Sequence, residues 1–224
     1  MSHLTFAEAE CAVKKRKTRR ELFLEKLEAL LPWKQLEARI AKHYARGEMG
    51  RPSYPLPAML RVHIMQLVYN LSDPAMEDTP YEIESMRRFA GIRLDRVPDE
   101  TTILDFRHLL ERHKLGKKLF HTINSHLDRH GLVLREGSIV DASIIAAPGS
   151  TKNKDGKRDP EMHQVKKGNE WHCGVKMHIG VDESLGLIHS LETTPANEHD
   201  LNVADKLLHG QETRVWADAG YTGA

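Results

Sequence analysis

The segments GSIVDASIIAAP (residues 137–148) and VWADAGYTGA (residues 215–224) decide the fold, because each sets one aspartate in an apolar run typical of a β-strand. The two aspartates are Asp141 and Asp218. A carboxylate placed in such a run loses hydration and needs a partner that compensates the loss. A divalent cation is a common partner for two aspartates on neighbouring strands. The alternative is that each aspartate is a capping or hydrogen-bonded structural residue.

The residues between these two runs predict how the aspartates meet. Segments 170–182 and 187–194 have the pattern of two antiparallel strands joined by a turn at 183–186, and segment 200–210 has that of a helix. Three strands, a helix and a strand in this order allow the first and last strands to pair through a crossover connection. Paired strands lie about 4.8 Å apart, so we expect Asp141 and Asp218 to reach a common cation.

Segment 171–182 alternates between two kinds of residue. One face carries Trp171, Cys173, Val175, Met177, Ile179 and Val181, and the other carries His172, Gly174, Lys176, His178, Gly180 and Asp182. We expect Trp171, Cys173 and also Trp216 to lie in the core. His172, Lys176 and His178 either line the catalytic side or are solvent-facing residues of a half-covered sheet.

The residues before 135 have the pattern of a helical domain. Thr18 and Glu21 have the spacing of a capping box, in front of a helix that ends near Pro32. Further helices are expected over 32–47, 57–71, 72–91, 99–113 and 113–131. Segment 148–170 is polar and contains glycine and proline, so we expect a basic loop or a disordered insertion there.

Composition excludes some classes of protein. The chain has 224 residues, a net charge of +1 and two cysteines, too few for a disulfide framework. No apolar run approaches the roughly 20 residues that span a bilayer, and no apolar secretory signal begins the chain, so a cytoplasmic protein is expected. The overall charge does not indicate a nucleic-acid partner.

Local clusters of positive charge are more suggestive of DNA. The run at 14–20 is dense in basic residues, and more lysines occupy the polar segment near residue 160. The alternative is that these are solvated faces or disordered arms. The residues that we expect to contact phosphates are Lys14, Lys15, Arg16, Lys17, Arg19, Arg20, Lys166, Lys167 and Lys176.

A second candidate DNA contact is a pair of helices. Segments 81–91 and 100–113 can form a helix-turn-helix-like pair, in which the second helix presents Thr101, Thr102 and Arg107 to DNA. The alternative is ordinary helix packing, with Arg107 paired to an acidic neighbour.

Several long segments resemble a known family. They are MSHLTFAEAE (1–10), RRELFLEKLEALLPW (19–33), the stretches 54–92 and 97–111, the stretch 139–182 from IVDAS to GVD, TPANEHDLN (194–202) and WADAGYTGA (216–224). In these segments the chain resembles the bacterial DDE transposases of the insertion-sequence-five family.

The resemblance implies a fold, a chemistry and partners. The fold is α/β: an all-α N-terminal domain over 1–135 for DNA binding and dimerisation, then over 136–224 an RNase H-like mixed sheet with the basic loop at 148–170. Asp141 is implied as the first family aspartate and Asp218 as the second, and both hold Mg²⁺ or Mn²⁺. The implied reaction is cutting and strand transfer of double-stranded DNA at terminal inverted repeats and at a target. A homodimer is implied, with no membrane and no small-molecule substrate.

The chain departs from the family pattern in one respect. The family's third carboxylate is a glutamate on a helix beyond the second aspartate, and no residue of this sequence is assigned to that role. We therefore expect an incomplete RNase H-like sheet and a C-terminally truncated protein that is inactive alone. The alternative is a non-catalytic DNA-binding remnant or an inhibitor of the intact transposase. Asp182, Glu183, Glu192, Glu198 and Asp200 lie elsewhere in the pattern, and Asp200 is expected to cap a helix.

Overall fold

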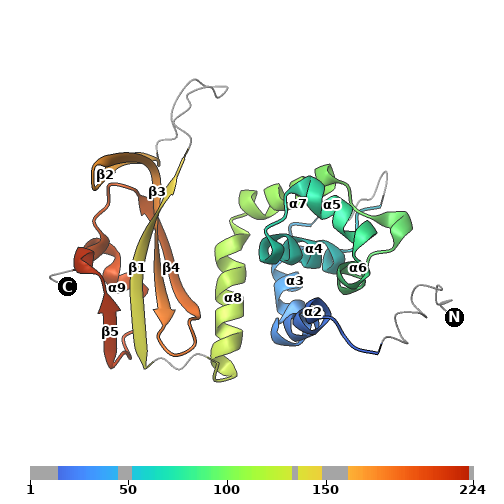
Figure 1. Ribbon diagram of the computed structural model, residues 1–224, viewed down its shortest axis with the longest axis horizontal. Coiled ribbons are helices and arrows are strands. Elements are labelled where there is room, and N and C mark those ends of the chain that lie inside the picture. Colours follow the sequence, from blue (N-terminus) through green and yellow to red (C-terminus); the bar gives the residue numbers. More distant parts are fainter. Residues whose placement is uncertain (1–14, 45–51, 133–135, 148–160, 222–224) are drawn as a thin grey trace. The chain divides into compact units, whose positions relative to one another are not determined.

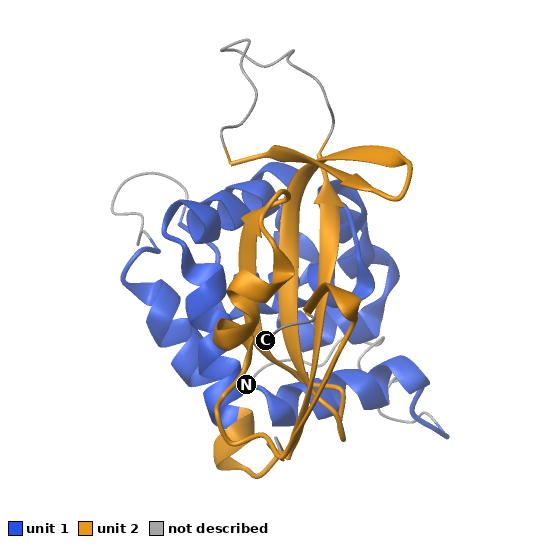
Figure 2. Cartoon of the chain, turned by 90° about the vertical axis from the view of Figure 1, so that its left-hand side faces the viewer, with its two compact units in different colours: residues 1–126 blue, residues 127–224 orange. Residues whose placement is uncertain are grey.

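The chain forms two compact units, residues 1–126 and residues 127–224 (Figure 2). The structure is a computed structural model that describes residues 15–44, 52–132, 136–147 and 161–221. No helix in these ranges is long and apolar enough to cross a bilayer.

Unit 1 is built from helices, as the sequence predicts (Figure 1). Thr18 and Glu21 form the capping box in front of the first described helix. Gly91 ends a later helix with a φ of 67°, a left-handed conformation that glycine adopts without steric cost. The helices are α2 (Arg19–Leu30), α3 (Trp33–Ala41), α4 (Leu56–Tyr69), α5 (Asp73–Glu82), α6 (Glu84–Ala90), the short η1 (Leu94–Arg96), α7 (Glu100–Arg112) and α8 (Leu115–Arg129).

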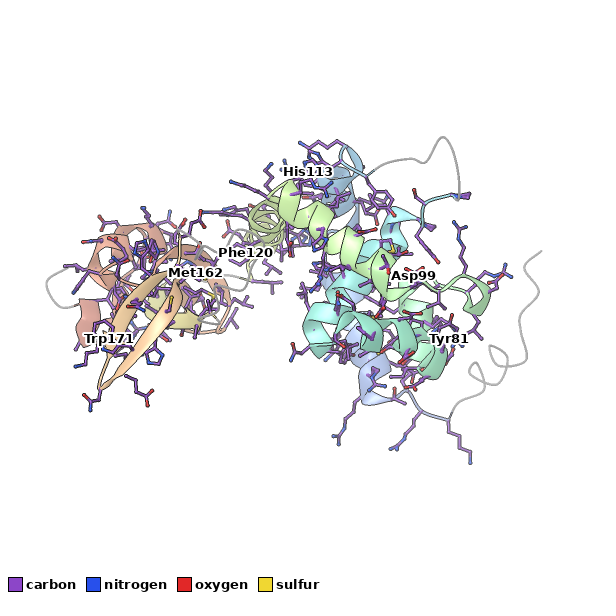
Figure 3. The ribbon with its side chains drawn as sticks, turned by 90° about the horizontal axis from the view of Figure 1, so that it is seen from above. Tyr81, Asp99, His113, Phe120, Met162 and Trp171 are labelled. Carbon is purple, nitrogen blue, oxygen red and sulfur yellow. The ribbon has the colours of Figure 1, made fainter. Side chains whose placement is uncertain are left out.

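Two apolar clusters hold these helices together. Met65 and Met76 are fully buried in the first cluster, and Leu36 and Ile40 lie in the second. Asp99, labelled in Figure 3, is the N-cap of α7, and its side chain accepts a hydrogen bond from the Thr102 backbone amide at 2.7 Å. Capping side chains therefore mark the starts of α2, α5 and α7, and apolar burial supplies the main stabilisation of the helices.

Unit 2 is a five-stranded mixed sheet. Its strands are β1 (Gly137–Ala146), β2 (His163–Lys167), β3 (Glu170–Asp182), β4 (Ile188–Pro195) and β5 (Arg214–Ala217). β1 pairs with β3 on one side and, in parallel, with β5 on the other. β2 and β4 share the far edge of β3, β2 along residues 170–174 and β4 along residues 175–181. The predicted pairing of the first and last strands is thus confirmed, as is the α/β class.

Two predictions for the connecting segments are wrong. Residues 163–167 of the expected loop form β2, because a hairpin turn at Gly168, with a φ of 62°, lets this segment pair with the start of β3. The rest of that loop, 148–160, lies outside the described residues. The expected helix over 200–210 is shorter and consists of η2 (Asp200–Val203) and α9 (Ala204–Leu207). Its N-cap is His199, whose side chain accepts from the Leu201 amide, and not Asp200.

The burial of β3 is the reverse of what its hydropathy suggests. Lys176, His178 and Asp182 are at most 9% exposed, whereas the apolar residues on the other face are only partly buried. Trp171, labelled in Figure 3, is 68% exposed and Trp216 is 57% exposed, so the prediction that they lie in the core is wrong. The solvent-facing alternative is also wrong for Lys176 and His178.

The polar face of β3 is buried because the segment after β4 covers it. Val203, Ala204 and Leu207 pack with Val140 of β1 and with Tyr221 in a small apolar cluster. Gly180 permits this approach, since a Cβ there would collide with the Leu207 carbonyl oxygen. This cover brings Asp200 over the sheet beside Lys176.

Candidate functional site

Asp141 and Asp218 lie at the same level on neighbouring parallel strands. The last pair in the register of β1 and β5 is Val140 with Ala217, and each aspartate is the next residue along its chain. Asp218 follows the end of β5 and does not lie inside it. Both aspartates are exposed, so the expected loss of hydration does not occur.

A backbone amide orients each of these carboxylates. The Ala142 amide donates to Oδ1 of Asp141 at 2.8 Å, and the Gly220 amide donates to Oδ1 of Asp218 at 2.9 Å. The second of these bonds closes the short η3 turn (Ala219–Tyr221) that follows β5. Each side chain is therefore held by its own local backbone, which reduces the conformational entropy that a ligand must overcome.

A third carboxylate, Asp200, approaches Asp218 at Gly220. A Cβ added at Gly220 would lie 3.0 Å from Oδ2 of Asp200 and 3.0 Å from Oδ1 of Asp218. The two carboxylate oxygens are thus no more than twice that distance apart. A side chain at Gly220 would therefore press on both carboxylates.

Lys176 holds Asp200 in place. Its ammonium donates to Oδ1 of Asp200 at 2.8 Å and to the Glu198 carbonyl oxygen at 2.6 Å. The side chains of Lys176 and Asp200 are 11% and 21% exposed, so water screens this ion pair only weakly. Lys176, predicted to contact DNA phosphate, is thus directed into the protein.

His178 lies behind the same carboxylate and is completely buried. Its Nε2 is hydrogen-bonded to the Thr194 hydroxyl at 2.8 Å, and its Nδ1 lies 3.8 Å from Oδ1 of Asp200. Burial lowers the pKa of His178 below its usual value, and the charge of Lys176 acts in the same direction against the opposing pull of Asp200. The ring is therefore neutral at neutral pH, and Lys176 is the cation that balances Asp200.

Tyr221 is buried in the small apolar cluster that covers the sheet. It is 6% exposed, and no group in the described part of the chain forms a hydrogen bond with its hydroxyl. Burial, together with repulsion from Asp200, Asp141 and Asp218, raises the pKa of Tyr221 to about 12. The hydroxyl thus stays protonated at neutral pH and remains a hydrogen-bond donor.

These residues suit a divalent cation. Carboxylate oxygens are the ligands that Mg²⁺ prefers, and Asp141 and Asp218 are both exposed. Among the described residues, no three His, Cys, Asp or Glu side chains are close enough to hold an ion as one group. Asp141 and Asp218 are the candidate direct ligands, and Asp200 is engaged by Lys176.

The residues predicted to contact DNA lie in several places. Lys14 lies outside the described residues, and Lys17 pairs with Glu25 at 2.6 Å. The guanidinium of Arg20 lies 5.7 Å from the centre of the Tyr69 ring. Lys15, Arg16, Lys17, Arg19, Arg20, Lys166 and Lys167 are exposed.

The candidate recognition helix is α7. Thr101 is exposed, and Thr102 is partly buried with its amide bonded to the N-cap. Arg107 donates to Asp73 of α5 at 2.9 Å. This ion pair supports the alternative in which Arg107 holds two helices together.

Sequence reasoning assigned Asp200 only to helix capping and gave Gly220 and Tyr221 no role. Each belongs to a segment quoted above, 194–202 or 216–224, but periodicity along one strand does not show which distant segment covers it. The burial of Lys176, which requires an acidic partner for its ammonium, becomes visible only in the structure.

Two family models match the chain. A transposase domain model (DUF772) matches residues 11–109, and a transposase DDE domain model matches residues 134–224. The second match contains the three aspartates and Lys176. No solved structure matches the chain.

Proposed function

Since the chain belongs to the DDE transposases, a family that binds DNA and uses divalent metal ions, we propose that Asp141 and Asp218 are its catalytic carboxylates. The proposed reaction is cutting and strand transfer of insertion-sequence DNA ends, with Mg²⁺ or Mn²⁺. The supporting observation is their position at one level on β1 and β5.

In this reaction the role of the protein is to hold acidic metal ligands in place. A divalent cation held by Asp141 and Asp218 would activate water and stabilise the charge that develops on the leaving oxygen. The amides of Ala142 and Gly220 fix one oxygen of each carboxylate before any ligand arrives. Such preorganisation matters because each 1.36 kcal/mol of lost transition-state stabilisation lowers the rate about tenfold.

We propose that residues 1–135 bind DNA and form the dimer contact, and that residues 136–224 carry the chemistry. The exposed cations at 15–20, with Lys166 and Lys167 on β2, would contact phosphates. Each lost phosphate contact should reduce the slope of log K against log salt by about 0.9. Replacing Arg16 and Arg19 by alanine tests this proposal in a gel-shift assay with salt titration.

The test of the catalytic proposal uses duplexes that carry the two ends of the DNA element encoding the chain. Nicking of these duplexes by the full chain with Mg²⁺ or Mn²⁺, abolished in Asp141→Asn and Asp218→Asn while DNA binding persists, would support the catalytic assignment and contradict the expectation that the chain is inactive alone. Asp105→Asn, an exposed substitution in α7 with the same change of charge, is the matched control. Binding without any metal-dependent nicking by the unaltered chain would instead favour the non-catalytic DNA-binding role.

A further inference from the structure

The end of α3 lies against the junction between α7 and α8. The rings of His43 and His113 stack there, with their centroids 4.1 Å apart and their planes inclined by 23°. His113, labelled in Figure 3, is the C-cap of α7, and α8 begins two residues later at Leu115. The stack therefore joins two segments of unit 1 that are each rich in basic residues.

Basic side chains of both segments gather around this stack. We call them the basic corner: Arg39, Lys42, His43, His113, Lys114 and Lys118. Arg39 and Lys42 are three residues apart at the end of α3, so they lie on neighbouring positions of one helix face. Lys114 stands immediately before α8, and Lys118 lies in its first turn. Burial, and then repulsion from the stacked ring, Lys42 and Lys118, lowers the pKa of His43.

The positive charge of the basic corner is not balanced from within the described residues. Its lysines and its arginine are exposed, and none of them forms an ion pair in that part of the chain. The carboxylates nearest in sequence act elsewhere, since Glu37 lies 3.7 Å from Arg61 of α4 and Glu111 acts on His63. The whole chain has a net charge of only +1, so the corner is a local concentration of positive charge.

The backbone of Lys114 is a second, independent observation. Its φ is 50°, in the left-handed region that favours glycine. Gly91 after α6 and Gly131 after α8 adopt the same conformation, with φ of 67° and 66°, without steric cost. A lysine bears strain there, and strained residues are retained mainly at functional sites. The lysine at this position therefore calls for a reason other than backbone geometry.

We propose that the basic corner contacts the phosphate backbone of duplex DNA. The inference rests on the proposed function only for the class of partner. Exposed cations spread over two segments match the regular row of phosphates along a duplex, and neutralising them also removes their mutual repulsion. Contacts of this kind add affinity and salt dependence but carry no sequence information.

The experiment is a gel-shift assay with salt titration on the full chain. One duplex carries an end of the DNA element, and a second has the same length and an unrelated sequence. The double variant Lys42→Gln with Lys118→Gln should reduce the slope of log K against log salt by about 2 on both duplexes, at about 0.9 for each lost contact. Lys26→Gln with Lys206→Gln, exposed and with the same change of charge, is the matched control and should keep the slope of the unaltered chain.

Lys114→Gly separates a contact with DNA from a structural role. The substitution removes the charge and relieves the left-handed backbone, so the melting temperature should stay the same or rise while the salt slope falls by about 0.9. A lysine that only supports the fold would give the reverse, a lower melting temperature with an unchanged slope.

The outcomes also distinguish the basic corner from the proposed function. If the double variant and Lys114→Gly both keep the slope of the unaltered chain, the corner is refuted, while DNA binding by the unaltered chain still stands. A loss confined to the duplex with the element end would also refute it, because phosphate contacts act on any sequence. If the unaltered chain binds neither duplex at low salt, the proposed DNA binding is itself wrong and the corner falls with it.

Discussion

Replacing Lys176 by methionine tests whether its ion pair with Asp200 holds the cover on the sheet. The substitution keeps most of the buried side-chain length but removes the ammonium and both of its hydrogen bonds, to Asp200 and to the Glu198 carbonyl. Asp200 then loses the cation that balances it, while its side chain remains only 21% exposed.

The expected magnitude follows from these contacts. Breaking a fully buried ion pair costs about 3–5 kcal/mol, and a hydrogen bond to a charged group contributes about 1.5–3 kcal/mol. Some water reaches Asp200, so we expect a loss of about 2–4 kcal/mol. Since 1.4 kcal/mol corresponds to a factor of ten, amide hydrogen exchange in β3 and α9 should accelerate about 30- to 700-fold.

Hydrogen exchange measured by mass spectrometry on the full chain provides the assay, because it reports on unit 2 separately from unit 1. Lys206→Met, an exposed substitution on α9, is the matched control and should stay within about 0.5 kcal/mol. The double variant with Asp200→Asn should lose about 1–3 kcal/mol less than the two single losses added together. Less than a threefold acceleration in Lys176→Met, or strictly additive losses, would refute the assigned ion pair.

Three further predictions concern stability. Burial lowers the pKa of His63 to about 4, so between pH 6.5 and 4 the unfolded chain binds a proton that the folded chain does not. The free energy of unfolding in urea should therefore be unchanged above pH 6.5 and should fall by up to about 3 kcal/mol as the pH drops toward 4. An equal loss in His63→Gln would contradict this cause. Gly180→Ala should destabilise unit 2 by about 1–3 kcal/mol and so lower its melting temperature, since the added Cβ collides with the Leu207 carbonyl oxygen. Gly116→Ala places its Cβ in open space and should leave stability unchanged. Thr18→Ala removes the capping box of α2 and should cost unit 1 about 1 kcal/mol in chemical unfolding, with Thr18→Ser close to the unaltered chain.

Local signals in the sequence were sufficient for most elements. Thr18 and Glu21 mark the start of α2 because a capping box depends on residues three apart, and Gly91 marks the end of α6 because few other residues adopt a left-handed backbone. The alternation of residue types in 171–182 predicts β3, since successive side chains of a strand point to opposite faces of its sheet. These features depend on neighbours in the chain, so a single sequence reports them.

The site shows where that reasoning ends. The sequence singled out Asp141 and Asp218 together, but it did not predict that both are exposed. The exposure of a strand residue depends on what covers each face of its sheet. Asp200 was assigned to helix capping, which is a local role, whereas its ion pair with Lys176 and its close approach to Gly220 join segments about 20 residues or more apart. Segment 163–167 was assigned to a loop because its residues are mostly polar and show no strand pattern. It forms a strand because it pairs with β3.

The sequence by itself determined most of the helical and strand segments, the parallel pairing of the first and last strands, and the two sets of residues that alternate along β3. Only the tertiary structure decided which of those sets is buried and which third carboxylate stands beside the pair. The physical reason is that hydropathy reports the free energy of transferring a single, unpaired side chain out of water. A lysine and an aspartate that form an ion pair in the fold compensate each other's loss of hydration. That compensation exists only once η2 has been placed over β3, and no local pattern in the chain specifies this placement.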